Sequence, residues 1–192
     1  MQEHEAIARM QRGDISGLDS LVKTYQVEAL RTAMLITRDK ALAEDVVQNA
    51  FIRAYQRIDQ FDASRPFAPW FMRSVANAAV QASQKDQRNL SLDVDVNEGA
   101  TFEDLLPTTT GIPDEKLEAK ERQQLIKDAL DQLTPEQRSA VVMRYFLDMS
   151  EEDMSTALET PKGTIKWRLH ESRKRLRGLL QRMTTTANEW GG

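Results

Sequence analysis

The residues with the clearest potential to bind a ligand form a basic segment between Pro161 and Arg182. Eight cations stand there against a single acid, Glu171, which gives the segment a net charge of +7. At about 100° per residue, one face of a helix over this segment carries Gly163, Lys166, Trp167, His170, Arg173 and Lys174. Cations neutralise phosphates while the other side chains reach base edges in a major groove. The pattern therefore predicts a DNA-reading helix.

The other face of this helix is expected to be buried, and a short helix is expected to precede it. One stripe holds Ile165, Leu169, Ser172, Leu176 and Leu180. Helix starts are predicted at Thr134-Pro135, at Ser150-Glu151 and at Thr160-Pro161, because each pairs a capping hydroxyl with a proline or an acid. Such short, capped helices with tight turns indicate a helix-turn-helix. The alternative is a basic helix whose charged face is merely solvated.

A second surface is predicted on the helical segment that follows Asp39. Its apolar residues share one arc, and the opposite arc carries Asp45, Gln48, Asn49, Ile52 and Gln56. A solvated face is the ordinary explanation of such a set, and a lone exposed isoleucine is weak support for a partner.

A third surface is predicted on the helix that begins near Phe67. Its apolar arc holds Phe71, Val75 and three alanines, and the opposite arc carries Trp70, Arg73, Asn77, Gln81, Gln84 and Arg88. An aromatic ring, amides and cations on one face suit unpaired DNA, because bases stack on rings and amides bond their exposed edges. The alternative places Trp70 in the core and leaves the amides facing solvent.

The charge distribution divides the chain into two parts. Between Ser91 and Glu121, nine acids stand against two lysines, a net charge of −7, and the segment has linker composition. We therefore expect an all-α protein with helical domains at residues 1–90 and 114–183, an extended acidic linker at 91–113 and a tail at 184–192. With a total charge of −4, the chain is expected to bind free DNA weakly.

The composition excludes several other classes. Apolar residues make up 40% of the 192, with no run long enough to cross a membrane, so a soluble protein without membrane insertion is expected. The start of the chain lacks the pattern of a secretory signal, and the absence of cysteine suits the cytoplasm. His4 and His170 have no metal-ligand spacing, and neither a phosphate-binding glycine loop nor a nucleophile elbow is present. No enzyme activity, metal or cofactor is expected.

The C-terminal segment resembles region 4 of bacterial sigma factors. The resemblance rests on Ser150, Glu151, Glu152, Met154, Leu158, Pro161, Gly163, Thr164, Ile165, Lys166, Arg168, Leu169, His170, Arg173 and Leu176. It implies that the minus-thirty-five promoter element is read by Lys162, Thr164, Lys166, Trp167, His170, Glu171, Arg173 and Lys174. Ser155 and Glu159 replace the usual alanine and turn glycine, which is expected to loosen the turn. Trp167 replaces a small residue and predicts an unusual promoter preference.

The N-terminal half resembles sigma region 2. The sequence AEDVVQNAFIRAY is similar to the region that docks on the clamp helices of the polymerase large subunit, which implies docking by Asp45, Gln48, Asn49 and Ile52. Asn49 replaces the usual glutamate. The following helix is similar to regions 2.3–2.4, which implies minus-ten reading by Trp70, Arg73, Asn77, Gln81 and Arg88, with residues 60–68 as the loop that captures a flipped base.

The order and separation of these segments are typical of the small extracytoplasmic-function sigma factors. The resemblance implies binding to core RNA polymerase through its clamp helices and flap, recognition and opening of promoter DNA, and regulation by an anti-sigma factor. The alternative is a stand-alone helix-turn-helix regulator, which explains the basic helix and leaves the two N-terminal faces without a role. A helical adaptor that binds only protein leaves the basic segment unexplained.

Overall fold

The computed structural model describes residues 2–90 and 124–189, with side chains described for 3–86 and 124–178. Within these residues every regular element is a helix, so the predicted all-α fold is confirmed. The chain divides into two compact units, Met1–Leu105 and Leu106–Gly192. The expected linker at residues 91–113 lies outside the described residues. In the part of the chain that is described, no helix has the length and apolarity that a membrane crossing requires.

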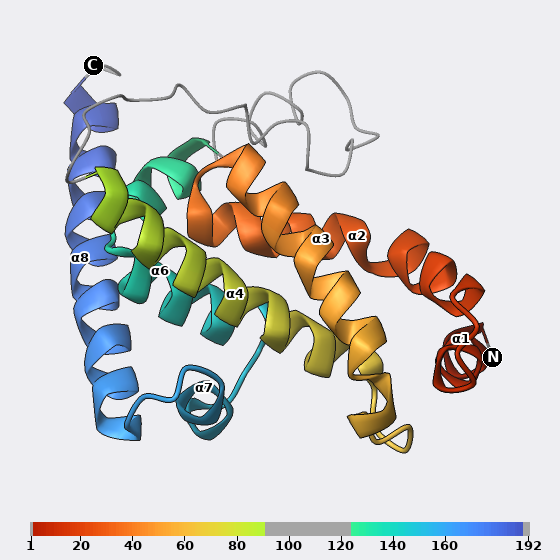
Figure 1. The fold of residues 1–192 in the computed structure, drawn as a ribbon. Helices are drawn as coiled ribbons and strands as arrows, with labels where there is room; N and C mark the ends of the chain where they lie inside the picture. Colours follow the sequence, from red (N-terminus) through yellow and green to blue (C-terminus); the bar gives the residue numbers. More distant parts are fainter. Residues whose placement is uncertain (1, 91–123, 190–192) are drawn as a thin grey trace. The chain divides into compact units, whose positions relative to one another are not determined.

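The first unit is built around α2 (Ser16–Thr37), which packs against α1 (Gln2–Gln11), α3 (Lys40–Gln56) and α4 (Phe67–Leu90). Figure 1 shows these helices from red to yellow-green along the chain, with the short η1 (Ile58–Gln60) after α3. Aromatic rings fill the space between α3 and α4. The rings of Phe51 and Phe71 lie 4.4 Å apart, and those of Phe67 and Phe71 stack at 5.5 Å. This aromatic core fixes α4 against α3.

The junction between α2 and α3 is a tight, capped turn. Arg38 ends α2 in the left-handed conformation, with φ of 64°, and its N–H donates to the Met34 carbonyl at 3.0 Å. Asp39 then caps α3, because its carboxylate accepts the Leu42 N–H at 2.7 Å. The direction of α3 is therefore set at its first residue.

Helix α1 is joined to the rest of the unit through Glu3. The Tyr25 hydroxyl donates to one carboxylate oxygen of Glu3, and the Phe67 N–H at the start of α4 donates to the other at 3.4 Å. Burial and the bond to Glu3 raise the pKa of Tyr25 above its ordinary value, so the phenol remains a donor. One carboxylate thus links α1, α2 and α4.

The α1–α2 contact also depends on Gly17. A Cβ built at this position would lie 2.2 Å from the backbone oxygen of Ala6 and 3.0 Å from Cγ of Met10. We expect Gly17→Ala to lower the free energy of unfolding by about 1–3 kcal/mol, the usual cost of overpacking. Gly178 is a matched control, because a Cβ there meets open space, and alanine in a helix is favourable by up to about 1 kcal/mol. Calorimetric melting of both variants checks this, and an unchanged transition for Gly17→Ala would contradict it.

The second unit contains helical residues 124–131, α6 (Pro135–Val141), the π-helical turn η3 (Val142–Phe146), α7 (Glu151–Ala157) and α8 (Lys162–Glu189). Thr134 and Gln137 form a capping box at the first predicted helix start, with bonds of 3.3 and 3.2 Å. Ser150 caps α7 by accepting the Asp153 N–H at 3.1 Å. The third helix starts later than predicted. The Thr160 hydroxyl donates to the carbonyl of the earlier residue Leu158 at 2.8 Å, and α8 begins two residues after Thr160, at Lys162.

Helix α8 is longer than the periodicity of the sequence indicated. It continues to Glu189, well into the residues expected to form a tail. The periodicity fades after Met183 because apolar residues stop recurring there, yet Thr184-Thr185-Thr186 and the residues after them contain neither glycine nor proline until the end of the helix. The helical backbone therefore extends beyond its amphipathic part.

Candidate nucleic-acid interface

Helices α7 and α8 form the predicted helix-turn-helix. Ile165, Leu169 and Ser172 of α8 are buried, as the apolar stripe requires, and Met154 of α7 is fully buried in the same core. Ser172 also holds α8 to α6, since its hydroxyl lies 3.3 Å from the Gln137 carbonyl. The stripe thereby fixes which face of α8 is presented outward.

The outward face of α8 contains most of the residues predicted for minus-thirty-five reading. Thr164 and Glu171 are half-buried, and the exposed members are Lys162, Lys166, Trp167, His170, Arg173 and Lys174. Trp167 is 59% exposed although it is a large apolar side chain. An exposed indole among cations is consistent with a surface that contacts another molecule.

A side-chain hydrogen bond spans the turn between α7 and α8. The Ser155 hydroxyl donates to the Thr160 carbonyl at 2.7 Å. The expectation that Ser155 loosens the turn stays a prediction. Glu159 does occupy the position of a glycine, because its φ is 47°, and a non-glycine residue in this conformation costs about 1–2 kcal/mol.

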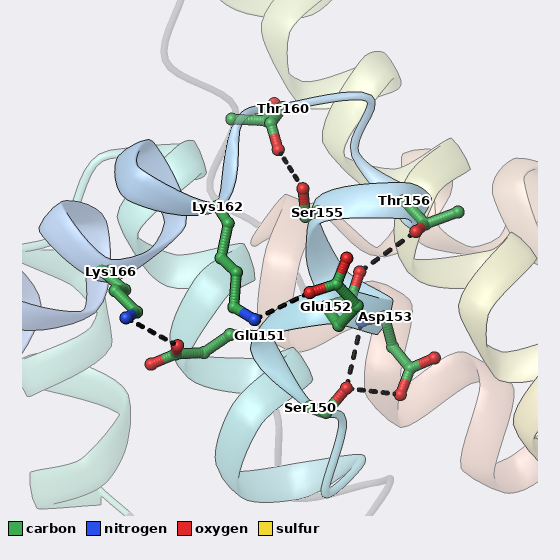
Figure 2. A network of polar contacts seen from close by, with 9 residues as sticks. All are labelled: Ser150, Glu151, Glu152, Asp153, Ser155, Thr156, Thr160, Lys162 and Lys166. Atoms are coloured by element: carbon green, nitrogen blue, oxygen red, sulfur yellow. Dashed lines mark hydrogen bonds and ion pairs between the residues drawn. The ribbon is translucent and has the colours of Figure 1, made fainter.

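Two lysines at the start of α8 are paired with acids at the start of α7, as Figure 2 shows. Lys162 Nζ lies 2.7 Å from Glu152 Oε2, and Lys166 Nζ lies 3.8 Å from Glu151 Oε2. The hydrogen bond to Glu152 raises the pKa of Lys162 above its ordinary value. The sequence predicts a helix start at Ser150-Glu151 and does not indicate that these acids pair with α8. Their pairing with α8 depends on how the turn folds back.

A groove of about 390 Å³ lies between α3 and α4 in the first unit. Trp70, Arg73, Asn77 and Gln81, predicted from one face of α4, all line it. The side chain of Arg88, the fifth member of that set, lies outside the described residues. The structure thus gathers the described members of this set into one hollow.

Trp70 and Asn77 have unlike surroundings in this groove. Trp70 is half-buried, with its ring 5.1 Å from that of Phe61 and 5.5 Å from that of Phe67, so it belongs partly to the core. The Asn77 side-chain oxygen is buried and accepts no hydrogen bond within the described residues. A buried acceptor without a partner is costly, and functional sites are one place where it occurs.

The loop that leads into α4 is ordered by Asp62. Its carboxylate accepts the backbone N–H of Ser64 at 3.0 Å and the Ser64 hydroxyl at 2.7 Å. These bonds lower the pKa of Asp62 below its ordinary value. Arg65 adds an exposed ion pair to the same carboxylate at 3.4 Å. These local hydrogen bonds give the loop a defined conformation. This loop is the segment that is expected to capture a flipped base.

The residues predicted for polymerase docking lie together on α3. Asp45, Gln48 and Asn49 are exposed, and Ile52 is 45% exposed. The Asn49 amide donates to the Asp45 carbonyl at 2.8 Å, which orients its side chain along the helix. Asp45 and Asn49 line a second groove, which shares Arg53 and Gln81 with the first.

Two groove residues were missed from the sequence. Arg53 of α3 and Arg57, which directly follows α3, line the same hollow as Trp70 and Asn77. Helical periodicity describes each face within its own helix, and only the packing of α3 on α4 brings the two arginines beside the α4 residues. The spacing of four residues indicates that the two arginines lie on one side of α3 and its end, but it does not indicate that this side faces α4.

Comparison with known proteins agrees with this arrangement. Residues 21–89 match the model of sigma-70 region 2, and residues 123–176 match the model of sigma-70 region 4. The chain is 28% identical over 183 residues to the ECF RNA polymerase sigma factor SigW of Bacillus subtilis, covering 94% of this chain and 98% of that relative. It is 29% identical over 182 residues to the RNA polymerase sigma-H factor of Pseudomonas aeruginosa, covering 94% of each chain.

Solved structures show the same fold. The sigma factor RpoE of Bartonella quintana, solved with the anti-sigma factor NepR, matches with a TM-score of 0.60 and 26% identity, covering 81% of this chain and 91% of that one. CnrH, solved with the cytosolic domain of CnrY, shares the fold with a TM-score of 0.57 and 20% identity, covering 94% of this chain and 98% of that one. A stand-alone helix-turn-helix regulator does not account for the match to region 2, so that alternative is wrong. The chain belongs to the sigma-70 family and is an extracytoplasmic-function sigma factor, which directs RNA polymerase to promoters.

Proposed function

We propose that this sigma factor divides its work among three surfaces. The exposed residues of α3, Asp45, Gln48, Asn49 and Ile52, dock on the clamp helices of core polymerase. The α4 residues Trp70, Arg73, Asn77, Gln81 and Arg88 read and open the minus-ten element. The α8 residues Lys162, Thr164, Lys166, Trp167, His170, Glu171, Arg173 and Lys174 read the minus-thirty-five element. The observation that supports this best is the gathering of the described α4 residues in one groove of region 2.

The assignment of α8 rests on its two unlike faces. Ile165 and Leu169 are buried, so the cations and the exposed ring of Trp167 must point away from the domain. A helix presented in this way inserts into a major groove, with cations on phosphates and other side chains on base edges.

The partners follow from the family and from the solved neighbours. We propose binding to core polymerase through its clamp helices and flap, and regulation by an anti-sigma factor, since the RpoE of Bartonella quintana was solved with one. The proposed location is the cytoplasm, where the polymerase works. The proposed role is not enzymatic and uses no cofactor.

Run-off transcription tests the proposal directly. Core polymerase is supplied with a library of genomic promoter fragments, with and without the chain, and the transcripts are sequenced. We expect a limited set of start sites that depends on the chain and shares two upstream elements. A start-site pattern that is the same with and without the chain would contradict the proposal.

The ion pairs of Figure 2 predict the effect of one acid on minus-thirty-five binding. Glu152→Gln is expected to strengthen holoenzyme binding to minus-thirty-five duplex DNA about 3-fold, because Lys162 is released from an exposed ion pair of modest strength. Glu159→Gln is the matched control, since it removes the same charge near the turn and forms no ion pair within the described residues. Fluorescence anisotropy measures both affinities. An equal gain in the two variants would show that net charge alone is responsible.

A further inference from the structure

Helix α1 is bonded to both ends of the loop that leads into α4. At the α4 end, the Phe67 N–H donates to a carboxylate oxygen of Glu3 at 3.4 Å. At the other end, the Gln11 side-chain amide donates to the Ile58 carbonyl of η1 at 3.4 Å. Glu3 and Gln11 are eight residues apart, which is about 12 Å along the axis of α1. One short helix therefore holds the two ends of the loop relative to each other.

The turn that follows α1 is attached to the same part of the unit. The Tyr55 hydroxyl, in the last turn of α3, donates to the Gly13 carbonyl at 3.1 Å. Gly13 has φ of 81°, a conformation that favours glycine, and its N–H donates to the Met10 carbonyl at 2.9 Å. The C-terminal end of α1 is thus bonded both to the end of α3 and to η1.

The loop itself has buried ends and an exposed middle. Phe61 and Phe67 are buried, with their rings 5.5 Å apart in an edge-to-face arrangement, while residues 62–66 are exposed. The Phe61 ring also lies 5.1 Å from the ring of Trp70. A shift of Phe67 would therefore move the base of the loop together with a ring that is proposed to read the minus-ten element.

Glu3 is chemically suited to fix the start of α4. Phe67 is the first residue of α4, and the first N–H groups of a helix have no partner within the helix. A carboxylate at this place accepts such an N–H and also interacts favourably with the helix dipole. The second carboxylate oxygen of Glu3 accepts the Tyr25 hydroxyl, and the Tyr25 ring lies 5.6 Å from that of Phe67. The carboxylate is therefore held against the residue whose N–H it accepts.

Helix α1 lies outside the residues matched to sigma-70 region 2, because the match begins at residue 21 and α1 ends at Gln11. We propose that α1 positions the loop at residues 60–68 for capture of a flipped base, with Glu3 as the positioning residue at the α4 end and Gln11 at the η1 end. This inference rests on the proposed minus-ten function and extends it to a helix that precedes the matched residues. A loop whose ends are already fixed loses less conformational freedom when it takes up a base, so the cost of flipping is more readily offset.

Strands that each lack one base test the proposal. Holoenzyme is titrated with the non-template minus-ten strand of a promoter found by run-off transcription, either intact or with a single abasic position. With the wild-type chain, the position that causes the largest loss identifies the captured base, and the ratio of intact to abasic affinity measures its capture. We expect Glu3→Ala to lower this ratio about 5-fold and Gln11→Ala about 3-fold, because a hydrogen bond to a charged group is the stronger of the two. Affinity for the abasic strand should not change.

Glu5→Ala is the matched control for Glu3→Ala. It removes the same charge from the same helix, but Glu5 pairs with Arg9, which belongs to α1 itself. We expect the wild-type ratio for this variant. Glu3→Gln keeps one acceptor oxygen and should give a ratio between those of Glu3→Ala and the wild type.

Affinity for core polymerase and for minus-thirty-five duplex should remain at the wild-type level in all of these variants. An unchanged ratio in Glu3→Ala and Gln11→Ala would overturn the inference. Equal weakening of the intact and abasic strands would overturn it as well, because a destabilised unit binds every strand less tightly. If no abasic position weakens binding by the wild-type holoenzyme, base capture itself is absent, and the proposed minus-ten function is wrong instead.

Discussion

Asp45→Arg is expected to lower the affinity for core RNA polymerase about 100-fold while leaving binding of minus-thirty-five DNA unchanged. Asp45 is exposed on α3, and no ion pair within the described residues engages it. Its charge is therefore available to a partner, and reversing a charge in a complementary interface costs several kcal/mol. Titration of labelled chain with core polymerase measures the loss.

A matched control for this substitution is Glu28→Arg. Glu28 is exposed on α2 of the same unit, so it receives the same charge reversal outside the proposed docking surface. We expect core affinity within about 2-fold of wild type for this variant. If the two variants lose affinity equally, the loss reflects the net charge of the unit and the docking role of Asp45 is wrong.

Lys166→Ala and Trp167→Ala are expected to weaken minus-thirty-five recognition by about 10-fold each while core affinity is retained. The two losses should differ in kind. Lys166→Ala should weaken binding to all sequences and lower the salt slope by about 0.9, as the loss of one duplex phosphate contact does. Trp167→Ala should reduce discrimination between promoter and non-promoter duplex, because this apolar residue, 59% exposed, is proposed to contact base edges and has no charge for phosphates.

Gel-shift titrations of holoenzyme at several salt concentrations measure both effects. Lys127→Ala, in the helical residues 124–131 of the same unit, is the control for removing a lysine that is not part of α8. Loss of core affinity in step with DNA affinity, in both α8 variants, would contradict the separation of the two roles.

The features that were readable from the sequence are those set within a single helix. The burial of Ile165, Leu169 and Ser172 follows from their spacing, and the caps at Thr134 and Ser150 follow from residue types three apart. Faces and helix starts are local properties, so one sequence is sufficient to predict them.

The features that were missed arise from the packing of one helix on another. Arg53 and Arg57 join the α4 residues only because aromatic rings such as Phe51 and Phe71 bring α3 against α4. The pairing of Lys162 with Glu152, ten positions apart, depends on the course of the turn. No local spacing rule reports such contacts.

Trp70 shows why the alternatives for that residue could not be separated beforehand. The sequence is compatible with a core role and with a ligand-facing role, and the structure gives Trp70 elements of each. Its ring packs on Phe61 and Phe67, and the residue also lines the groove. A half-buried aromatic residue fits the spacing of a core position and that of a ligand-facing position, so helical spacing alone cannot distinguish the two roles.

The most direct test of the central claim is a gel shift on a promoter fragment, with the chain alone and with the chain plus core polymerase. The basic α8 belongs to a chain whose net charge is −4, so the isolated chain should bind weakly. We predict a stable, sequence-specific complex only when core polymerase is present. Tight specific binding by the chain alone, unchanged by core polymerase, would contradict the account.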